Sequence, residues 1–153
     1  MFNLVLYKPE IPPNTGNISR LAVGIGASLH IVDKPAFDIS EKAVKRAGLD
    51  YWDDLHLVLH ENWESFESKI EDRSRVFLVT KFGKTLYSSI QFKKNDYLVF
   101  GSETSGLPSQ VKDSYPESNK LFIPMLPISR SINLSNSVAI LAYEGIRQIG
   151  LNS

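Results

Sequence analysis

The feature that most constrains this chain is an alternation of short, β-rich apolar runs with segments of helical periodicity. Several of the runs are almost continuously apolar, which is typical of strands covered on both faces of a parallel sheet. We therefore expect an α/β fold with a mostly parallel sheet flanked by helices. The runs expected as strands are Phe2–Tyr7, Ser28–Asp33, His56–Leu59, Arg75–Thr80, Tyr97–Phe100 and Lys120–Ile123.

The first helix is well marked by its boundary residues. It follows two prolines, with Asn14 as the expected N-cap and with Gly24 and Gly26 as the expected stop. Arg20 lies about 200° around this helix from the apolar Ile18. We therefore expect the Arg20 side chain to point away from the core.

The last helix, from Ser135 to about Ile149, carries a continuous apolar face. Packing of this face on the sheet is the first interpretation, and a subunit interface is the second. In the middle of the chain, Glu41–Ala47 and Asn62–Ile70 are expected as helices. Lys81–Asn95 is expected as an irregular connection in which one short strand would fit.

Length and composition limit the alternatives. A chain of 153 residues favours a single domain spanning 1–153. The 17 basic and 17 acidic residues cancel, so net charge gives no support to nucleic-acid binding. The chain has no cysteine, which excludes thiolate nucleophiles and cysteine-based zinc sites. No basic leader and no long apolar run is present, so we expect a cytoplasmic location.

Three loops are richer in glycine, proline, hydroxyl and amide groups than simple connections need. Two of them follow expected strands, and ligands of open α/β sheets bind beyond the carboxyl ends of strands. We therefore expect the three loops to converge on one pocket. Their chemistry suits a nucleoside without phosphate, for which S-adenosylmethionine is one of several candidates. The loops are Pro9–Asn17, Gly101–Pro108 and Ile123–Asn136.

Other motifs are incomplete. The Gly101 loop has the glycine spacing of a phosphate-binding P-loop, but Leu107 stands where that motif needs lysine. His30, His56 and His60 lie in or next to expected strands, without the spacing of metal ligands. We expect satisfied or surface histidines there and no metal.

The three loops resemble the three motifs of the SPOUT superfamily of RNA methyltransferases. Within it, the sequence is most similar to the short bacterial enzymes that methylate the ribose of tRNA nucleotide 34, the TrmL/YibK group. Order, spacing and total length also agree, so the resemblance covers essentially the whole chain. The matching stretches are Pro9–Leu21, Leu98–Pro108 and Ile123–Ile140.

The resemblance implies a SPOUT fold with a deep trefoil knot near the C-terminus, which periodicity alone would not predict. It also implies a homodimer with the active site near the interface. Members of this length have no added RNA-binding domain, so the dimer surface would bind the anticodon stem-loop of tRNA itself.

The resemblance further implies an activity, namely transfer of a methyl group from S-adenosylmethionine to the 2′-hydroxyl of the wobble pyrimidine of tRNA. Leucine tRNAs are the substrates that it suggests. Arg20 matches the arginine of the first motif and is the expected catalytic residue. A guanidinium is a poor base at neutral pH, which favours charge stabilisation, with an arginine base as the alternative. The implied cofactor contacts are Val79, Gly101, Ile123 and Ser131.

Further residues of the motifs carry more open interpretations. Arg130 is a candidate for a phosphate contact, and Asn133 for positioning the ribose or cofactor. Tyr143 either stacks on RNA or lies at the core edge. Two departures from the family pattern stand in the second motif, where Ser102 replaces a proline and Ser105 replaces an arginine.

Two alternative functions remain open from the sequence. One is another SPOUT activity, such as 2′-O-methylation of ribosomal RNA. The other is an RNA chaperone that binds the cofactor without turnover.

Overall fold

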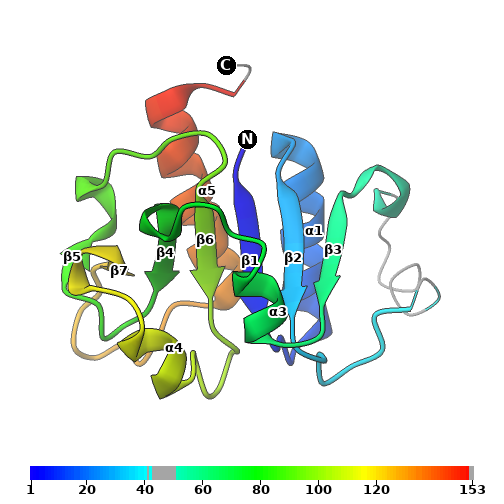
Figure 1. The fold of residues 1–153 in the computed structure, drawn as a ribbon, viewed down its shortest axis with the longest axis horizontal. Helices are drawn as coiled ribbons and strands as arrows, with labels where there is room; N and C mark the ends of the chain where they lie inside the picture. Colours follow the sequence, from blue (N-terminus) through cyan, green and yellow to red (C-terminus); the bar gives the residue numbers. More distant parts are fainter. Residues whose placement is uncertain (41, 43–50, 152–153) are drawn as a thin grey trace.

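A computed structural model describes residues 1–40, 42 and 51–151 (Figure 1). Seven strands form one sheet in the order β3-β2-β1-β6-β4-β7-β5, and every neighbouring pair is parallel. The expected parallel α/β sheet is therefore confirmed. The strands are β1 (Asn3–Tyr7), β2 (Ser28–Val32), β3 (Leu57–His60), β4 (Val76–Val79), β5 (Thr85–Leu86), β6 (Tyr97–Phe100) and β7 (Lys120–Phe122).

All six runs expected as strands are strands, with boundaries that differ by a residue or so. The connection 81–95 was expected to be irregular with one short strand, and β5 is that short strand. The expected helix Glu41–Ala47 lies outside the described residues, apart from Lys42. Among the described residues, the α-helices that cover the sheet are α1 (Pro12–Ile25), α3 (Trp63–Glu67), α4 (Ser109–Asp113) and α5 (Leu134–Ile149).

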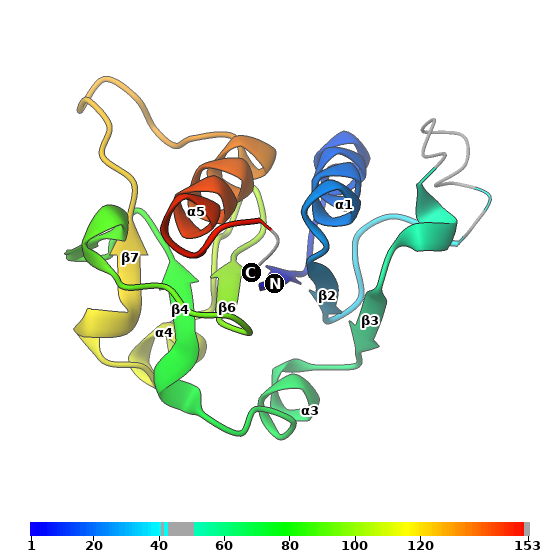
Figure 2. The ribbon, with the colours of Figure 1, turned by 90° about the horizontal axis from the view of Figure 1, so that it is seen from above.

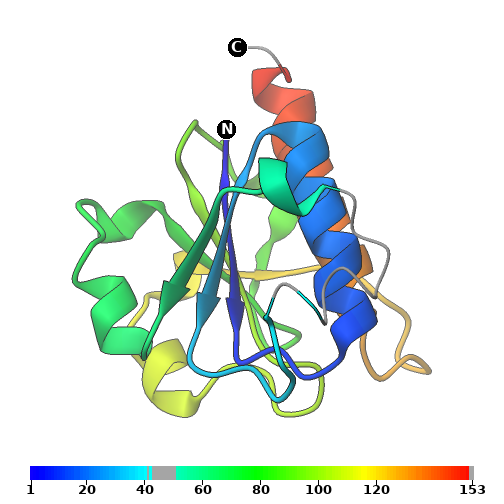
Figure 3. The ribbon, with the colours of Figure 1, turned by 90° about the vertical axis from the view of Figure 1, so that its right-hand side faces the viewer.

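The helices cover the sheet on both faces, with α1 and α5 on one side and α3 and α4 on the other (Figures 2 and 3). Alternate residues of each strand therefore enter two different cores. On β1, Leu4 and Leu6 join the core beneath α1 and α5, whereas Val5 joins the core beneath α3 and α4. All three side chains are fully buried.

The start of α1 corrects one expectation. The helix begins at Pro12, with Ile11 as N-cap, so Asn14 lies inside the first turn and is not the cap. Two prolines can open a helix because its first N–H groups have no intrahelical partner. At the other end Gly26 adopts φ +66° and ends the helix as expected, whereas Gly24 lies within it.

The helix α5 agrees with expectation on its core face. Val138, Leu141 and Ala142 are buried against the sheet. Asn133 is its N-cap, because the Asn133 Oδ1 atom accepts a hydrogen bond from the Ser135 amide at 2.9 Å. The helix expected over Asn62–Ile70 is shorter and occupies only Trp63–Glu67, as α3.

The edge of the sheet has an unusual connection. β7 lies between β4 and β5, although only residues 80–84 separate those two strands in sequence. The Thr80 amide donates to the Leu121 carbonyl at 2.9 Å. A Cβ on Gly83 would lie 2.6 Å from the Lys120 carbonyl oxygen, so the connection crosses β7 in backbone contact.

None of the helices formed by residues 1–40, 42 and 51–151 is both long and apolar enough to cross a membrane.

Candidate active site

Hydrogen bonds join the three polar loops, as their place after parallel strands predicts. The Glu103 carboxylate accepts from the amide of Glu10 at 2.8 Å, from the amide of Ile11 at 3.0 Å and from the Asn14 side chain at 3.3 Å. Asn14 Oδ1 in turn accepts from Asn133 Nδ2 at 3.1 Å. Glu103 therefore holds the first loop against the second, and Asn133 attaches the third.

The second loop is closed on itself. The backbones of Ser102 and Gly106 exchange two hydrogen bonds, of 3.3 Å and 3.0 Å. A Cβ on Gly101 would lie 2.6 Å from the Gly106 Cα, so only glycine fits there. Ser102 and Ser105, the two departures from the family pattern, are hydrogen-bonded to each other at 2.7 Å. Their hydroxyl groups close the second loop through this local hydrogen bond.

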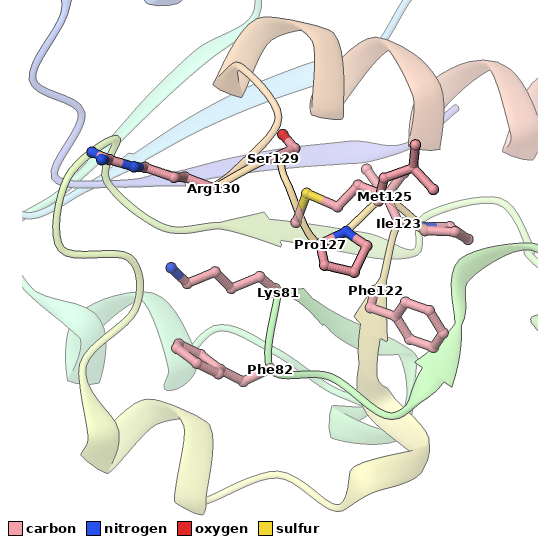
Figure 4. Close-up of a pocket in the computed structure, with 10 residues that line it drawn as sticks. Lys81, Phe82, Phe122, Ile123, Met125, Pro127, Ser129 and Arg130 are labelled. Atoms are coloured by element: carbon pink, nitrogen blue, oxygen red, sulfur yellow. The ribbon is translucent and has the colours of Figure 1, made fainter.

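A cavity of about 500 Å³ opens between the β4–β5 connection and the loop that follows β7 (Figure 4). Its size lies within the range of small-molecule sites. Two of the expected site residues, Ile123 and Arg130, line it. The full lining is Lys81, Phe82, Phe122, Ile123, Pro124, Met125, Leu126, Pro127, Ser129 and Arg130.

The other expected cofactor contacts lie around this cavity without lining it. Val79 ends β4 and Gly101 follows β6, so both lie at the carboxyl edge of neighbouring strands. Ser131 is exposed in the third loop, and its carbonyl accepts from the Ser129 hydroxyl at 3.4 Å. Of the expected cofactor contacts, Ile123 lines the cavity, whereas Val79, Gly101 and Ser131 do not.

Arg20 is exposed on α1, as its helical position predicts, and does not line the cavity. Its guanidinium lies 5.6 Å from the ring centroid of Tyr51, a cation–π distance. In Figure 2, α5 lies between α1, which carries Arg20, and β7, which leads into the cavity loop. Tyr143 on α5 is 56% exposed and does not belong to the core.

Sequence reasoning missed Lys81 and Phe82 as cavity residues. They lie in the connection that was expected to be irregular, and nothing in the local sequence shows that it crosses β7. Their place depends on the insertion of β7 between β4 and β5, which is a long-range pairing.

The apolar residues of the cavity fit the base of a nucleoside cofactor. Apolar and prolyl side chains such as Ile123, Met125 and Pro127 can flank a base, and the Ser129 hydroxyl adds hydrogen-bonding capacity. No three histidine, aspartate or glutamate side chains cluster as metal ligands within the described ranges.

Comparison with known proteins agrees with this geometry. The sequence model of the SpoU rRNA Methylase family matches residues 1–143. A tRNA (cytidine(34)-2′-O)-methyltransferase of Methylovorus glucosotrophus (strain SIP3-4) is 47% identical over 148 residues, which cover 97% of this chain and 96% of that protein.

Solved structures extend the comparison. One, described as giving structural insights into the 2-OH methylation of C/U34 on tRNA, has a TM-score of 0.90 and 41% identity, and the match covers 97% of this chain and 96% of that one. The SpoU methyltransferase AviRb of Streptomyces viridochromogenes, solved with the cofactor AdoMet, shares the fold at 24% identity (TM-score 0.82; 96% and 57% covered). With the match over nearly its whole length, this chain belongs to the SpoU rRNA Methylase family.

Proposed function

We propose that this protein transfers a methyl group from S-adenosylmethionine to the ribose 2′-hydroxyl of cytidine 34, the wobble nucleotide of tRNA. The observation that carries the proposal is the 47% identity, over nearly the full length of both chains, to a methyltransferase of that name. The joined motif loops beside a cavity with apolar walls supply independent support.

The proposed cofactor site is the cavity together with the strand ends beside it. Ile123 and Met125 supply apolar walls for the adenine, with Val79 and Gly101 at the adjacent strand ends and Ser131 in the third loop. When bound, the cofactor supplies a sulfonium-activated methyl group. The protein's own part is to hold the acceptor ribose in line with that methyl group.

Arg20 is the residue proposed to act at the acceptor oxygen. The hydroxyl must lose its proton as its oxygen attacks, so negative charge develops on that oxygen. A guanidinium is cationic at neutral pH and donates several N–H groups, which suits it to stabilise this charge while the proton leaves to water.

A second copy of the chain is proposed to complete the active site. Arg20 lies on α1 and is not among the residues that line the cavity of its own chain. In a two-fold dimer built on the face that carries α1 and α5, the Arg20 of one copy would approach the cavity of the other. The exposed Tyr143 ring on α5 fits such an interface or the RNA beside it.

The substrate proposed is the anticodon stem-loop of a cytoplasmic tRNA, with leucine tRNAs as the first to test and with uridine 34 as a second acceptor. Arg130, exposed at the cavity rim, is proposed to contact a phosphate. Asn133 is proposed to keep the third loop in position, since its side chain caps α5 and contacts Asn14.

A deep trefoil knot is proposed for the C-terminal part of the single domain. The insertion of β7 between β4 and β5, under a connection in backbone contact with it, supports this proposal. After β7 the chain returns to α5, where the Gln148 side chain bonds the backbone of Phe92 and Ile90 at 2.9 Å each.

Two alternatives are less well supported. Methylation of ribosomal RNA agrees with the family's name, but the 47% identical relative carries the name of a tRNA enzyme. A cofactor-binding RNA chaperone without turnover would not need Arg20 exposed on α1.

The test combines a deletion strain with one variant. Nucleoside mass spectrometry of tRNA from the deletion strain should show loss of the 2′-O-methylated wobble pyrimidine, which the wild-type gene restores. Arg20→Ala should lower methyl transfer at least a hundredfold while cofactor affinity and thermal unfolding stay near wild type. Unchanged methylation in the deletion strain would exclude the tRNA assignment, and near-normal turnover by the variant would exclude the role of Arg20.

A further inference from the structure

The β4–β5 connection exposes an aromatic ring between two cations. The Phe82 side chain is 68% exposed. The Lys81 ammonium lies 5.2 Å from the centroid of the Phe82 ring, and that of Lys112, on α4, lies 5.0 Å from it. A single exposed aromatic residue needs no explanation, but one flanked by two ammonium groups at the mouth of a cavity has a recognisable chemistry.

The cations beside this ring have no carboxylate partner among the described residues. In the part of the chain that the structure describes, no carboxylate lies within ion-pairing distance of Lys81, Lys112 or Arg130. Figure 4 shows Lys81, Phe82 and Arg130 extending toward the same side of the cavity. The cavity mouth therefore presents one apolar face and three positive charges to solvent.

The ring is carried by a fixed piece of backbone. The Gly83 amide donates to the Thr80 carbonyl at 3.0 Å, and the Phe82 amide donates to the Thr80 hydroxyl at 3.3 Å. Gly83 is in backbone contact with β7, where a Cβ would not fit. A rigid platform loses little entropy on binding, which favours a function in recognition over simple exposure.

We propose that Phe82 is a stacking platform for an unpaired base of the RNA substrate, with Lys81, Lys112 and Arg130 contacting the phosphates beside that base. The proposal rests on the proposed function, because it assumes an RNA substrate. Single-stranded RNA loops are recognised by aromatic rings that stack bases and by cations that follow the backbone. The surface at the cavity mouth combines both elements within one short connection and one neighbouring helix.

The alternative is that the Phe82 ring stacks on the adenine of the cofactor, since Phe82 also lines the cavity. The largely exposed ring and its two flanking ammonium groups favour a polyanion over a cofactor without phosphate. The cofactor becomes the alternative that the experiment has to separate.

The first measurement is binding of a fluorescein-labelled anticodon stem-loop RNA by anisotropy, with S-adenosylhomocysteine present. Phe82→Ala should weaken RNA binding about tenfold or more, whereas Phe82→Tyr, which keeps the aromatic face, should stay within about threefold of wild type. Calorimetry should find S-adenosylhomocysteine affinity unchanged in both variants. An equal loss of cofactor affinity in Phe82→Ala would assign the ring to the cofactor and overturn the proposal.

The second measurement is the salt dependence of the same binding. Lys112→Ala should lower the slope of log affinity against log salt by about one unit, because one phosphate contact is lost. Lys94→Ala is the matched control. Lys94 is exposed before the amino end of β6, whereas the cavity lies beyond the carboxyl ends of β4 and β7. Equal slopes for the two variants would show that Lys112 does not contact a phosphate.

Abasic substitutions along the RNA loop identify the stacked base. In wild type, one abasic position should cost about as much affinity as Phe82→Ala, and that same position should cost nothing further in the variant. Additive losses at every position would overturn stacking. If the wild-type protein neither binds nor methylates the stem-loop, the proposed function is wrong. If the wild-type protein does both, and Phe82→Ala binds the RNA with the same affinity, only the proposed stacking platform is wrong.

Discussion

At the scale of single residues, the buried histidine pair shows how an ordinary core position acquires pH sensitivity. His30 and His60 are 8% and 6% exposed and stack with ring centroids 5.2 Å apart. The His30 Nδ1 atom lies 2.9 Å from the His60 Nε2 atom, and the His30 Nε2 atom lies 3.1 Å from Asn3 Oδ1. Loss of hydration first, and the charge of His60 second, lower the pKa of His30 to about 4. Burial also lowers the pKa of His60.

This arrangement predicts acid sensitivity of the fold. Between pH 6.5 and about 4 the unfolded chain binds a proton at His30 that the folded chain does not. The free energy of unfolding is therefore fully retained above pH 6.5 and decreases as the pH falls through that window, by up to about 3 kcal/mol for this group. Urea unfolding at several pH values measures the decrease.

The matched variants separate this histidine from the carboxylates that titrate in the same range. His30→Gln should flatten the decrease, whereas His56→Gln, at an exposed histidine whose charge is only a smaller cause of the lowered pKa of His30, should leave most of it. Identical pH profiles for the two variants would show that the buried pair does not carry the effect.

At the scale of elements, local patterns predicted strands and helices better than they predicted the use of individual polar side chains. The six apolar runs became strands because burial on both faces leaves a direct record in the sequence. Asn14 was expected to cap α1, yet its side chain bonds Glu103 and Asn133, partners from loops far along the chain. Its local preference for capping was overridden by tertiary contacts that no short window contains.

The candidate site also has one part that the sequence predicts and one part that it does not. Convergence of the three motif loops was predictable, because the carboxyl ends of parallel strands meet at one edge of the sheet. The contribution of Lys81 and Phe82 was not, because it depends on a connection that crosses β7. The proposed knot rests on the family resemblance, and the alternation of strands and helices gives no sign of it.

Two helical glycines give an element-scale prediction with a built-in control. Gly145 on α5 has no room, since an added Cβ would lie 2.6 Å from Cε2 of the buried Phe2 ring. Gly24 on α1 has open space within 4 Å. Gly145→Ala should therefore lower the free energy of unfolding by about 1–3 kcal/mol, and Gly24→Ala should raise it by about 0.5–1 kcal/mol.

Chemical denaturation monitored by circular dichroism measures both changes. The cost of Gly145→Ala should shrink in a Phe2→Leu background, because the smaller side chain leaves room for the new methyl group. A cost that is the same in both backgrounds would show that the Phe2 contact does not keep glycine at this position.

At the scale of the whole molecule, the proposed catalytic residue and the proposed cofactor site belong to different elements. The cavity belongs to the β4, β5 and β7 edge, and Arg20 belongs to α1. Arg20 is not among the residues that line the cavity of its own chain. In the proposed two-fold dimer, the Arg20 of one copy would approach the cavity of the other, so activity would depend on assembly.

This arrangement makes a quantitative prediction for mixed dimers. Arg20→Ala removes the guanidinium, and Ile123→Trp fills the cavity, so each variant alone should be inactive. When the two are co-expressed and pair at random, half of the dimers contain one of each. Each mixed dimer then has one intact site, made from the Arg20 of one chain and the cavity of the other, so methyl transfer should recover to about a quarter of wild type.

The opposite geometry gives a different number. If Arg20 served the cavity of its own chain, every site in a mixed dimer would lack one of its parts, and co-expression would restore nothing. The comparison requires that the Ile123→Trp chain folds and pairs, which circular dichroism and the recovery of tagged mixed dimers verify independently of activity. Recovery therefore reports which chain supplies the guanidinium, because no other combination of the two variants contains a complete site.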